Sequence, residues 1–577
     1  CGSGHILVYM FEVLFNVYIK MGYNKNDIVS IILNNNLYGI DIDDRAAQLA
    51  TLSVLLKGRE YDKMLFSKTI DLNIVSIQET NNLSTNITDS LTEESKSTLF
   101  YLKDTFYDAK EYGSILKVEK KDYSNLIEEV NKNNNIFSFA FNYEYNPIIK
   151  QAEILSNKYD VLVTNPPYLG IRYFDEKLKQ YAEKHYKNSK HDLCTIFMDN
   201  SLLDENGVLG MVNQTTWLTQ DSFSLFRKQL LEEKTILSML ILDKNIMDAG
   251  LDICTFIIKN SKEENFLTSY YNVDSLENCV NYTKKYNVNN RKFLKSKDYA
   301  ILYNLSDNVY NIYQSGTPLS EIAPTKQGLA TSDNNRFLRE WYEVQYSKIG
   351  FECEQYNEQY KWYPCNKGGS YRKWYGNYNK IINWEFDGKE IKDYASKLYK
   401  SYTRTIKNIP LYFKPGITWN SLAKELGCRI VPKGFIFETK GSMMFPKDKD
   451  YLLYILGITN SKVINTVAQV ISPTLDFHEG PVGKLPIIIN KSRKEEIEKI
   501  VEKNIALSQE DWNSFETSWD FKIHPLIKEK EKFHYGEIGG KEYKLSDCYN
   551  HWQDSTEMSF NKLKENEEKL NEIFIDI

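Results

Sequence analysis

The sequence lacks a long hydrophobic run, a leader of the secretory type and paired cysteines. Because no stretch of about 18 uncharged apolar residues occurs, we expect no membrane-spanning helix and no membrane partner. Residues 1–5 have neither the basic nor the apolar region of a signal peptide. The eight cysteines form no C-x-x-C pair, so we expect neither a metal site nor a disulfide framework. Reduced cysteines in a large chain favour a cytoplasmic location.

Negative charge is scarce in one part of an otherwise acidic chain. The net charge of the 577 residues is -6, which argues weakly against a nucleic-acid partner. Residues 361–440, however, hold 16 Lys and Arg against only 6 Asp and Glu, a net charge of +10. Such a window is typical of a phosphate-binding surface, but a solvated basic face over aromatic core residues has the same composition. Charge alone leaves both interpretations open.

Hydrophobic periodicity near the start of the chain predicts a β-α-β arrangement. A helix is expected over residues 6–22, a buried strand over residues 37–43 and a second helix over residues 45–56. This alternation is typical of a parallel sheet covered by helices, and therefore of an α/β fold. Residues 80–150, rich in Asn, Ser, Thr and Lys, interrupt it and are interpreted as an insertion with helical pieces.

The alternation resumes after the insertion. Strands are predicted over residues 159–164, 207–212 and 254–259, and a helix is predicted over residues 192–204. These elements extend the α/β pattern toward residue 320.

Two changes of composition then divide the chain. From about residue 320 the sequence is basic and rich in Tyr and Trp, and from about residue 491 it is rich in Lys and Glu. A chain of this length exceeds one hydrophobic core. We therefore predict an α/β domain at 1–320, an α+β domain at 321–490 and a helical C-terminal segment at 491–577.

The first candidate site is the glycine-rich start of the chain. Gly2 and Gly4 flank Ser3 and lead into the first predicted helix. A turn without side chains lets backbone N–H groups approach a ligand at the positive end of the helix dipole, which suits a carboxylate or a nucleotide. Tight geometry alone also demands glycine, so this turn by itself does not establish a binding site.

Acids follow the strand predicted over residues 37–43. In dinucleotide-type folds an acid at a strand end accepts hydrogen bonds from ribose hydroxyls. Asp41 is the first choice for this role and Asp43 its competitor, although an acid here can instead cap the next helix. The spacing from the glycine-rich turn exceeds the roughly 20 residues of the dinucleotide fingerprint, which disfavours NAD.

The most specific feature is Asn165-Pro166-Pro167-Tyr168, directly after a predicted strand. Open α/β sheets bind ligands at the carboxyl ends of their strands. The two prolines fix φ and remove N–H donors, so the Asn165 side-chain oxygen and the Pro166 carbonyl form a rigid pair of acceptors. Such a pair can bind both N–H bonds of a nucleobase amine and stabilise the charge that develops during methyl transfer. The Tyr168 ring offers a stacking surface for a base that has left the duplex.

The motifs CGSGH (1–5), GIDID (39–43) and NPPY (165–168), in that order, resemble an adenine-N6 DNA methyltransferase of the gamma arrangement. The resemblance implies a Rossmann-like domain with a mixed, mostly parallel sheet, followed by an α+β target recognition domain. It also implies S-adenosyl-L-methionine as cofactor and double-stranded DNA as substrate. The residues it assigns to the cofactor are Cys1, Gly2 and Gly4 for the methionine part, and Asp41 or Asp43 for the ribose. Those it assigns to the target adenine are Asn165, Pro166, Pro167 and Tyr168. Glu79 is the candidate for contact with the adenine of the cofactor.

Later segments narrow the resemblance to the PglX methyltransferases of BREX phage-defence systems, over most of the chain. They are KQGL (326–329), NRFLR (335–339), FIF (435–437), ISPT (471–474) and DWNSFETSWDF (511–521). The resemblance implies site-specific adenine methylation in antiviral defence, with other defence-system proteins as partners. PglX-like proteins extend further at both ends. We therefore expect a strand and a cofactor motif before Cys1, further sequence beyond Ile577, and weak cofactor binding by these 577 residues alone.

In this family arrangement the basic window 361–440 falls in the recognition region, which favours phosphate contacts. Candidate DNA-binding residues are Lys326, Arg336, Arg372 and Lys373. Two alternatives stay open: the methyltransferase part of a fused restriction–modification enzyme, and a non-catalytic DNA-reading subunit that kept the fold. The same turn holds amino groups of RNA or of protein glutamine in other methyltransferases, but the large basic, aromatic second region favours duplex DNA.

Overall fold

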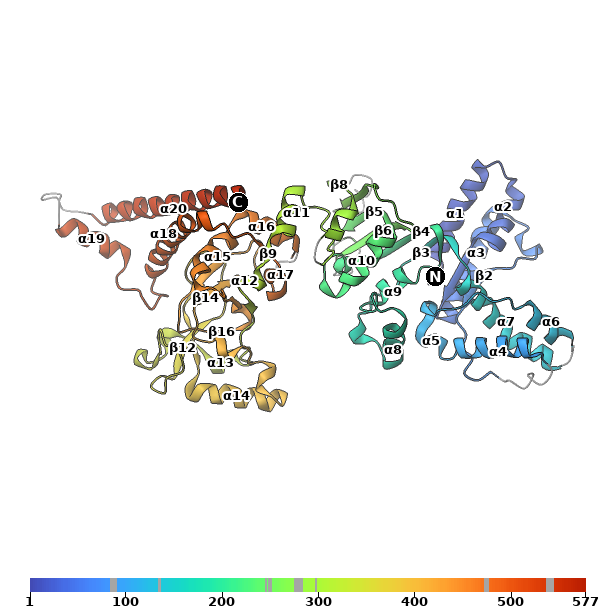
Figure 1. The fold of residues 1–577 in the computed structure, drawn as a ribbon, viewed down its shortest axis with the longest axis horizontal. Coiled ribbons are helices and arrows are strands. Elements are labelled where there is room, and N and C mark those ends of the chain that lie inside the picture. The colour runs from blue at the N-terminus through green and yellow to red at the C-terminus, as the bar shows by residue number, and fades with distance from the viewer. Residues whose placement is uncertain are drawn as a thin grey trace. The chain divides into compact units, whose positions relative to one another are not determined.

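The computed structural model describes residues 1–577 apart from residues 84–90, 133–135, 244–245, 247–251, 274–283, 296–297, 472–476 and 536–543. The chain packs into two compact units, Cys1–Tyr303 and Asn304–Ile577 (Figure 1). The three-part division of the chain stays a prediction. Of the segments that carry the family resemblance, residues 472–474 lie outside the described residues.

The first unit begins with a small parallel sheet between helices. Its elements are α1 (His5–Lys20), α2 (Lys25–Ile31), β1 (Tyr38–Asp41), α3 (Asp44–Tyr61) and β2 (Asn73–Ser76). β1 and β2 pair in parallel with Asp41 opposite Ser76, so the carboxyl ends of the two strands lie at the same edge. Apolar side chains of the three helices form the core beside the sheet, and Phe11 and Val54 are fully buried there. The predicted β-α-β order is confirmed.

A helical group follows β2, where the sequence predicts an insertion. Its helices are α4 (Glu93–Thr105), α5 (Ala109–Tyr112), α6 (Ser124–Lys132) and α7 (Ile136–Ser156). They share a core of their own, in which Leu99, Leu102, Val130 and Ala152 are fully buried. The expected helical pieces are therefore present, and α7 leads into the next strand.

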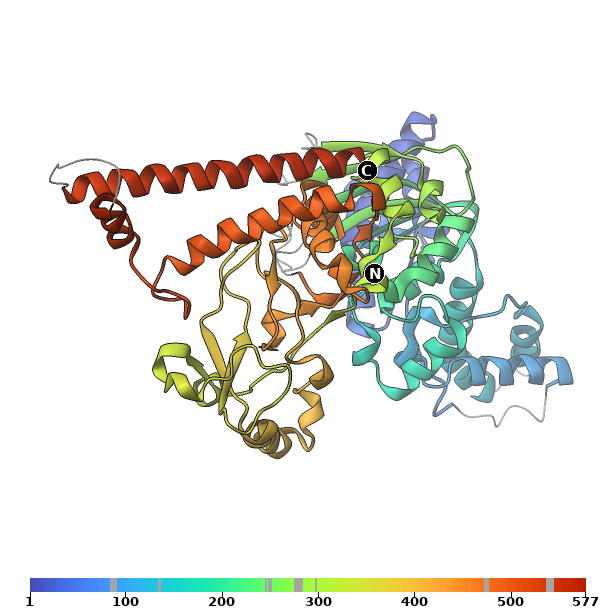
Figure 2. The same ribbon diagram turned by 60° about the vertical axis from the view of Figure 1, so that its left-hand side comes forward.

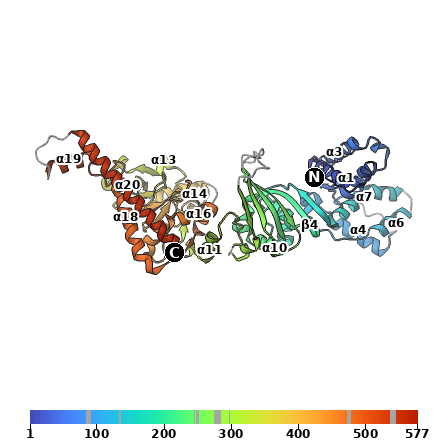
Figure 3. The same cartoon turned by 90° about the horizontal axis from the view of Figure 1, so that it is seen from above.

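A six-stranded sheet forms the second half of the unit. Its strands, in spatial order, are β3 (Tyr159–Thr164), β4 (Leu203–Gln214), β6 (Ile253–Lys259), β5 (Thr235–Leu242), β7 (Thr268–Val273) and β8 (Lys284–Val288). Figure 3 shows these strands side by side. β3 pairs with β4, and β5 with β7, in parallel. β6 runs antiparallel to both β4 and β5, and β8 runs antiparallel to β7.

The expected mixed sheet is confirmed, but the expectation that it is mostly parallel is wrong. With β1 and β2 included, three strand pairs in the described part of the first unit are parallel and three are antiparallel. The connections from β5 to β6 and from β7 to β8 are shorter than the dozen or so residues that a parallel crossover needs. These strands therefore return in the opposite direction.

The second unit contains two small four-stranded sheets. The first has the order β10 (Thr325–Lys326), β17 (Met443–Met444), β14 (Gly416–Trp419) and β15 (Cys428–Val431). The second has the order β11 (Leu338–Glu340), β13 (Lys380–Asn383), β12 (Trp362–Asn366) and β16 (Ile436–Phe437). The cores of this unit bury Trp374, Trp384 and Trp419 almost completely. Many of the aromatic residues in the basic window therefore belong to the core.

Helices end the second unit. They are α15 (Leu452–Thr459), α16 (Lys462–Ile471), α18 (Lys494–Asn513), α19 (Pro525–Tyr535) and α20 (Leu545–Asp576). Figure 2 shows α18 and α20 running along each other, and Asn566 of α20 donates a 2.9 Å hydrogen bond to Asn504 of α18. Three of these helices, α18, α19 and α20, lie within residues 491–577, and the division of the chain at residue 491 stays a prediction. Among the described residues, no helix has the length and hydropathy needed to cross a membrane.

Candidate active site

Residues 165–168 leave β3 at its carboxyl end and form the corner that the sequence singled out. Asn165 and Pro167 are exposed, Pro166 is buried and Tyr168 is partly buried. The Tyr168 hydroxyl donates a 3.0 Å hydrogen bond to the Asn165 Oδ1. The corner therefore keeps its acceptor amide on the surface and holds the tyrosine ring beside it.

Tyr168 lies close to the buried thiols of two neighbouring elements. Burial raises the pKa of the Tyr168 phenol, and the Cys194 and Cys254 thiols raise it further. Cys194 belongs to α9 (Leu193–Asp199) and Cys254 belongs to β6. The hydroxyl therefore stays protonated and remains a hydrogen-bond donor to Asn165.

Backbone hydrogen bonds attach the chain after the corner to the start of α9. The Leu193 N–H donates to the Leu169 carbonyl at 2.9 Å. Gly170 and Asp192 form an isolated antiparallel bridge. These contacts fix the residues that follow Tyr168 and so restrict the position of the corner itself.

Asp192 and Gln214 are two polar residues near the corner that sequence reasoning missed. Asp192 is only 4% exposed. Its Oδ1 accepts a 3.0 Å hydrogen bond from the Cys194 N–H and caps α9, while its Oδ2 accepts a 2.9 Å bond from Nε2 of Gln214, at the end of β4. An acid just before an apolar helical run is a visible cap signal. The pairing with Gln214 joins residues on two different elements, and no sequence pattern reports it.

The glycine-rich turn packs against α3. The Gly4 N–H donates to the Cys1 carbonyl at 3.1 Å, and Gly4 has a φ of 88°. A Cβ on Gly4 would lie 2.8 Å from the Ala50 Cα, so a side chain there would collide with the α3 backbone. Gly2 has a φ of 55°, and no atom lies within 4 Å of the position that its Cβ would take. Gly4 thus serves packing, whereas Gly2 faces open space.

Asp41 holds this turn at the end of β1. Its Oδ2 accepts hydrogen bonds from the Gly2 N–H at 2.7 Å and the Cys1 nitrogen at 2.9 Å, and its Oδ1 accepts one from the Asp43 N–H at 3.0 Å. Burial raises the pKa of Asp41, but these hydrogen bonds outweigh burial and leave the pKa below its ordinary value. The carboxylate is therefore ionised and lies directly beside Gly2.

Asp43 takes the capping role that its position before α3 had indicated. Its Oδ1 accepts hydrogen bonds from the Arg45 and Ala46 N–H groups at 2.7 Å and 3.1 Å. Since a carboxylate at the helix N-terminus satisfies otherwise unpaired N–H groups, this contact stabilises α3. Of the two acids, Asp41 is the one in contact with the glycine-rich turn.

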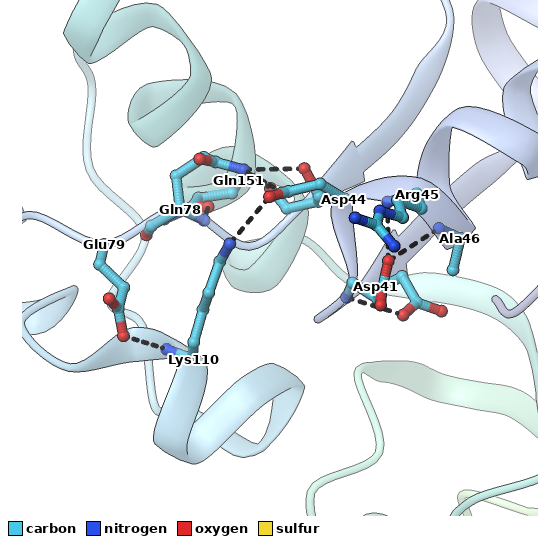
Figure 4. A network of polar contacts seen from close by, with 10 residues as sticks. Asp41, Asp44, Arg45, Ala46, Gln78, Glu79, Lys110 and Gln151 are labelled. Carbon is cyan, nitrogen blue, oxygen red and sulfur yellow. Dashed lines mark hydrogen bonds and ion pairs between the residues drawn. The ribbon is translucent and has the colours of Figure 1, made fainter.

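A second polar network lies at the carboxyl end of β2 (Figure 4). Gln78 Nε2 and Lys110 Nζ donate to the two carboxylate oxygens of Asp44, at 2.8 Å and 3.0 Å. The Lys110 contact is the first cause of the lowered pKa of Asp44. Glu79 Oε1 accepts a 3.1 Å bond from the Lys110 N–H, and Gln151 of α7 is hydrogen-bonded to the Gln78 backbone. Helices α5 and α7 therefore position the residues after β2.

The candidate residues of the first unit fall into two groups. Cys1, Gly2 and Asp41 contact one another directly, as do Asn165 and Tyr168. The strands that carry the two groups lie close where they begin, because the rings of Tyr38 in β1 and Tyr159 in β3 are 5.0 Å apart. Among the described residues, no hydrogen bond joins one group to the other.

Three of the four candidate DNA-binding residues have acidic partners within the second unit. Arg336 pairs at 2.7 Å with Glu390 of α14 (Glu385–Tyr399), and both side chains are almost half exposed. Arg372 pairs with Asp511 of α18, and Lys373 pairs with Glu567 of α20 at 3.1 Å. The ion pairs of Arg372 and Lys373 connect the basic window to the helical end of the unit.

Lys326 differs from these three residues. It is exposed on β10 and has no acidic partner among the described residues. The next residue, Gln327, is held by Lys407 and Asn408, which donate to its side-chain and backbone oxygens at 3.0 Å and 2.8 Å. A Cβ on Gly328 would lie 1.9 Å from the Phe437 carbonyl oxygen, so this segment lies directly on β16. Lys326 therefore projects from a firmly held backbone.

Comparisons with known proteins support the family resemblance that the sequence motifs indicated. Residues 35–246 match the family model described as Eco57I restriction-modification methylase. The chain is 30% identical to the adenine-specific methyltransferase PglX of Lacticaseibacillus casei (strain Zhang), over 100% of this chain and 50% of the relative. The resemblance to PglX is confirmed. The chain is also 33% identical to the adenine-specific methyltransferase BrxX of Escherichia coli O9:H4 (strain HS), over 93% of this chain and 47% of the relative. It thus spans about half the length of the curated relatives it matches.

A solved structure shares the fold. The Type IIL restriction-modification enzyme MmeI, solved in complex with DNA, superposes with a TM-score of 0.51 at 12% sequence identity. The superposition covers 97% of this chain and 72% of MmeI. At this level of identity the likeness is one of fold alone.

Proposed function

We propose that this chain is the catalytic part of a site-specific DNA methyltransferase that transfers a methyl group from S-adenosyl-L-methionine to N6 of adenine. The observation that carries the proposal is the corner at the end of β3, where Asn165 is exposed and Tyr168 is fixed beside it. The names of PglX and BrxX, both adenine-specific methyltransferases, support the same reaction class. The BREX-type antiviral role rests on the same relatives.

The corner offers two acceptors and one ring to an adenine flipped out of double-stranded DNA. The Asn165 Oδ1 and the Pro166 carbonyl accept the two N–H bonds of the N6 amine. Tyr168 occupies one lone pair of the Asn165 Oδ1 and fixes the amide, which leaves the second lone pair for the substrate. As the N6 lone pair bonds to the methyl carbon, the bond from that carbon to the sulfonium sulfur would break and leave a neutral thioether, and the two acceptors would stabilise the positive charge that develops on N6. The amine would then release a proton to solvent, so no covalent intermediate with the protein is required.

The glycine-rich turn and Asp41 fit the cofactor. The open space at Gly2 leaves room for a ligand beside the ionised Asp41, whose carboxylate can accept hydrogen bonds from ribose hydroxyls. Cys1, Gly2 and Gly4 would line the methionine part, and Glu79 would meet the cofactor adenine. When bound, S-adenosyl-L-methionine supplies a methyl group activated on a sulfonium.

The second unit is proposed to bind the DNA backbone. Its basic window, residues 361–440, has a net charge of +10. Lys326 can contact a phosphate directly, whereas Arg336, Arg372 and Lys373 could do so only by giving up the carboxylate partners that hold them in the second unit. Such contacts make binding weaken steeply as salt rises.

Methyl transfer by the full-length gene product tests the proposal. The protein is incubated with tritiated S-adenosyl-L-methionine and adenine-containing duplex DNA, and the labelled base is identified after digestion. We expect N6-methyladenine from the native protein and none from Asn165→Ala. No transfer by the native protein, or full transfer by Asn165→Ala, would contradict the mechanism.

A fused restriction–modification enzyme is the second candidate, favoured by the match of residues 35–246 to a restriction-modification methylase family model. In that case the full-length protein would cleave unmethylated DNA in the presence of Mg²⁺. A cleavage assay on host DNA with and without prior methylation separates this function from methylation alone.

A further inference from the structure

Gln214 lies at the same edge of the sheet as the corner, on the neighbouring strand. β3 and β4 pair in parallel, and their last paired residues are Thr164 and Met211. Asn165 directly follows Thr164, and Gln214 is the third residue after Met211. Gln214 is only partly buried, so its side chain is accessible at this edge.

Asp192 fixes the orientation of the Gln214 amide. Gln214 Nε2 donates to Asp192 Oδ2 at 2.9 Å, so the amide nitrogen is the atom that faces Asp192. Asp192 also caps α9 and is bridged to Gly170, two residues after Tyr168. The same buried acid therefore holds Gln214 and the chain that leaves the corner.

The Gln214 amide has one N–H bond without a strong acceptor. Nε2 carries two N–H bonds, of which one donates to Asp192, and the side chain also contacts the Cys194 thiol, whose sulfur is only a weak acceptor. We propose that the second N–H donates to a ring nitrogen of the target adenine, which makes Gln214 a specificity-determining residue of the base site and Asp192 its positioning residue. This inference rests on the proposed function, because the base reaches this edge only if the corner receives its amine.

The chemistry of adenine fits this division of roles. Its N6 amine is a donor, and its ring nitrogens are acceptors. Two acceptors at Asn165 and Pro166 and one donor at Gln214 would therefore complement adjacent positions of one purine. The competing interpretation is purely structural, with Asp192 as a helix cap and Gln214 as its hydrogen-bond partner.

Substrate analogues separate the two interpretations. The full-length protein is assayed on duplexes that carry its mapped site with adenine, 1-deazaadenine, 3-deazaadenine or 7-deazaadenine at the target position. For each enzyme, kcat/KM with adenine is divided by kcat/KM with each analogue. This ratio does not depend on the fraction of enzyme that is folded, and Gln214→Met serves as a second variant that keeps the side-chain volume.

For one analogue, we expect this ratio to be about five- to tenfold larger for the native protein than for Gln214→Ala or Gln214→Met. A difference of this size corresponds to the loss of about one hydrogen bond. Asp192→Asn should give an intermediate ratio. Gln180→Ala, which alters an exposed glutamine of α8 (Glu176–His185), should keep the native ratios. Equal ratios for the native protein and both Gln214 variants with all three analogues would overturn the inference alone. No methyl transfer to adenine by the native protein would overturn the proposed function as well.

Discussion

The corner after β3 and the basic window of the second unit are both proposed to meet DNA, yet their polar groups are arranged in opposite ways. At the corner, buried Asp192 and backbone hydrogen bonds hold the chain, and the Asn165 amide is left exposed. In the basic window, Arg372 and Lys373 already have carboxylate partners on α18 and α20. A polar group on a rigid backbone with accessible atoms indicates a binding site more directly than basic composition does.

Replacing Asn165 gives the largest expected effect and tests the corner side of this comparison. Asn165→Ala removes one of the two acceptors for the amine, and loss of one preorganised polar contact of this kind costs about 100- to 1000-fold in kcat. Because Asn165 is exposed, the thermal unfolding temperature of the Asn165→Ala variant should hardly differ from that of the native protein. Steady-state methylation and thermal denaturation check both expectations. Asn206→Ala, at an exposed position near the other end of β4, should keep native activity; an equal loss there would refute the special role of Asn165.

Local sequence patterns predicted the elements that carry the candidate site. The strand predicted over residues 159–164 coincides with β3, and the strand at 37–43 contains β1. Both signals are local, because a short apolar run ends in turn-forming or acidic residues. The helix predicted over 192–204 ends early, at Asp199, because residues 203–206 already belong to the extended β4.

Contacts between distant residues could not be predicted in this way. The Asp192–Gln214 pair requires β3, β4 and α9 to be packed together, and the ion pair of Lys373 with Glu567 spans almost 200 residues. The prediction of mostly parallel strands was wrong because β5 was not among the predicted strands, so the short connection from β5 that makes β6 return antiparallel could not be recognised.

The two glycines of the glycine-rich turn, Gly2 and Gly4, can be compared with each other, and the expected effect on stability is the next largest. Gly4→Ala places a Cβ 2.8 Å from the Ala50 Cα at a φ of 88°. Steric overlap and the left-handed conformation together should lower the free energy of unfolding by about 2–4 kcal/mol. Gly2→Ala, at a φ of 55° with open space around it, should cost only about 1 kcal/mol. Urea unfolding of both variants measures the difference, and equal losses would show that Gly4 is not required for packing on α3.

Removing single positive charges from the second unit tests its proposed role in DNA binding, and the expected effects are smaller. Lys326→Ala should weaken DNA binding severalfold and reduce the log–log salt slope by about 0.9, because one phosphate contact is lost. Arg372→Ala should leave that slope unchanged and lower the free energy of unfolding by about 1 kcal/mol, through loss of the Asp511 ion pair and the contact over the Trp512 ring. Fluorescence anisotropy across a salt series and urea unfolding provide the two readouts. A reduced slope in Arg372→Ala would show that its ion pair opens to receive a phosphate.

The pH dependence of stability provides the smallest expected effect and concerns Asp41. Its pKa in the folded state is lowered, since the hydrogen bonds from the Asp43, Cys1 and Gly2 nitrogens outweigh the opposing effect of burial. A lowered pKa means that the ionised form is stabilised by folding. This contribution is therefore complete above the unfolded pKa of about 3.9 and is lost as the pH falls through the folded pKa. Unfolding free energies measured from pH 6 down to the acid limit should fall less steeply for Asp41→Asn than for the native protein, whereas Asp160→Asn, at an exposed position in β3, should follow the native curve. Parallel curves for Asp41→Asn and the native protein would mean that the turn at Gly2 is held without the ionised carboxylate. The contrast within the first unit, between Asp41 as a structural acid and Asn165 as an amide free for substrate, would then no longer hold.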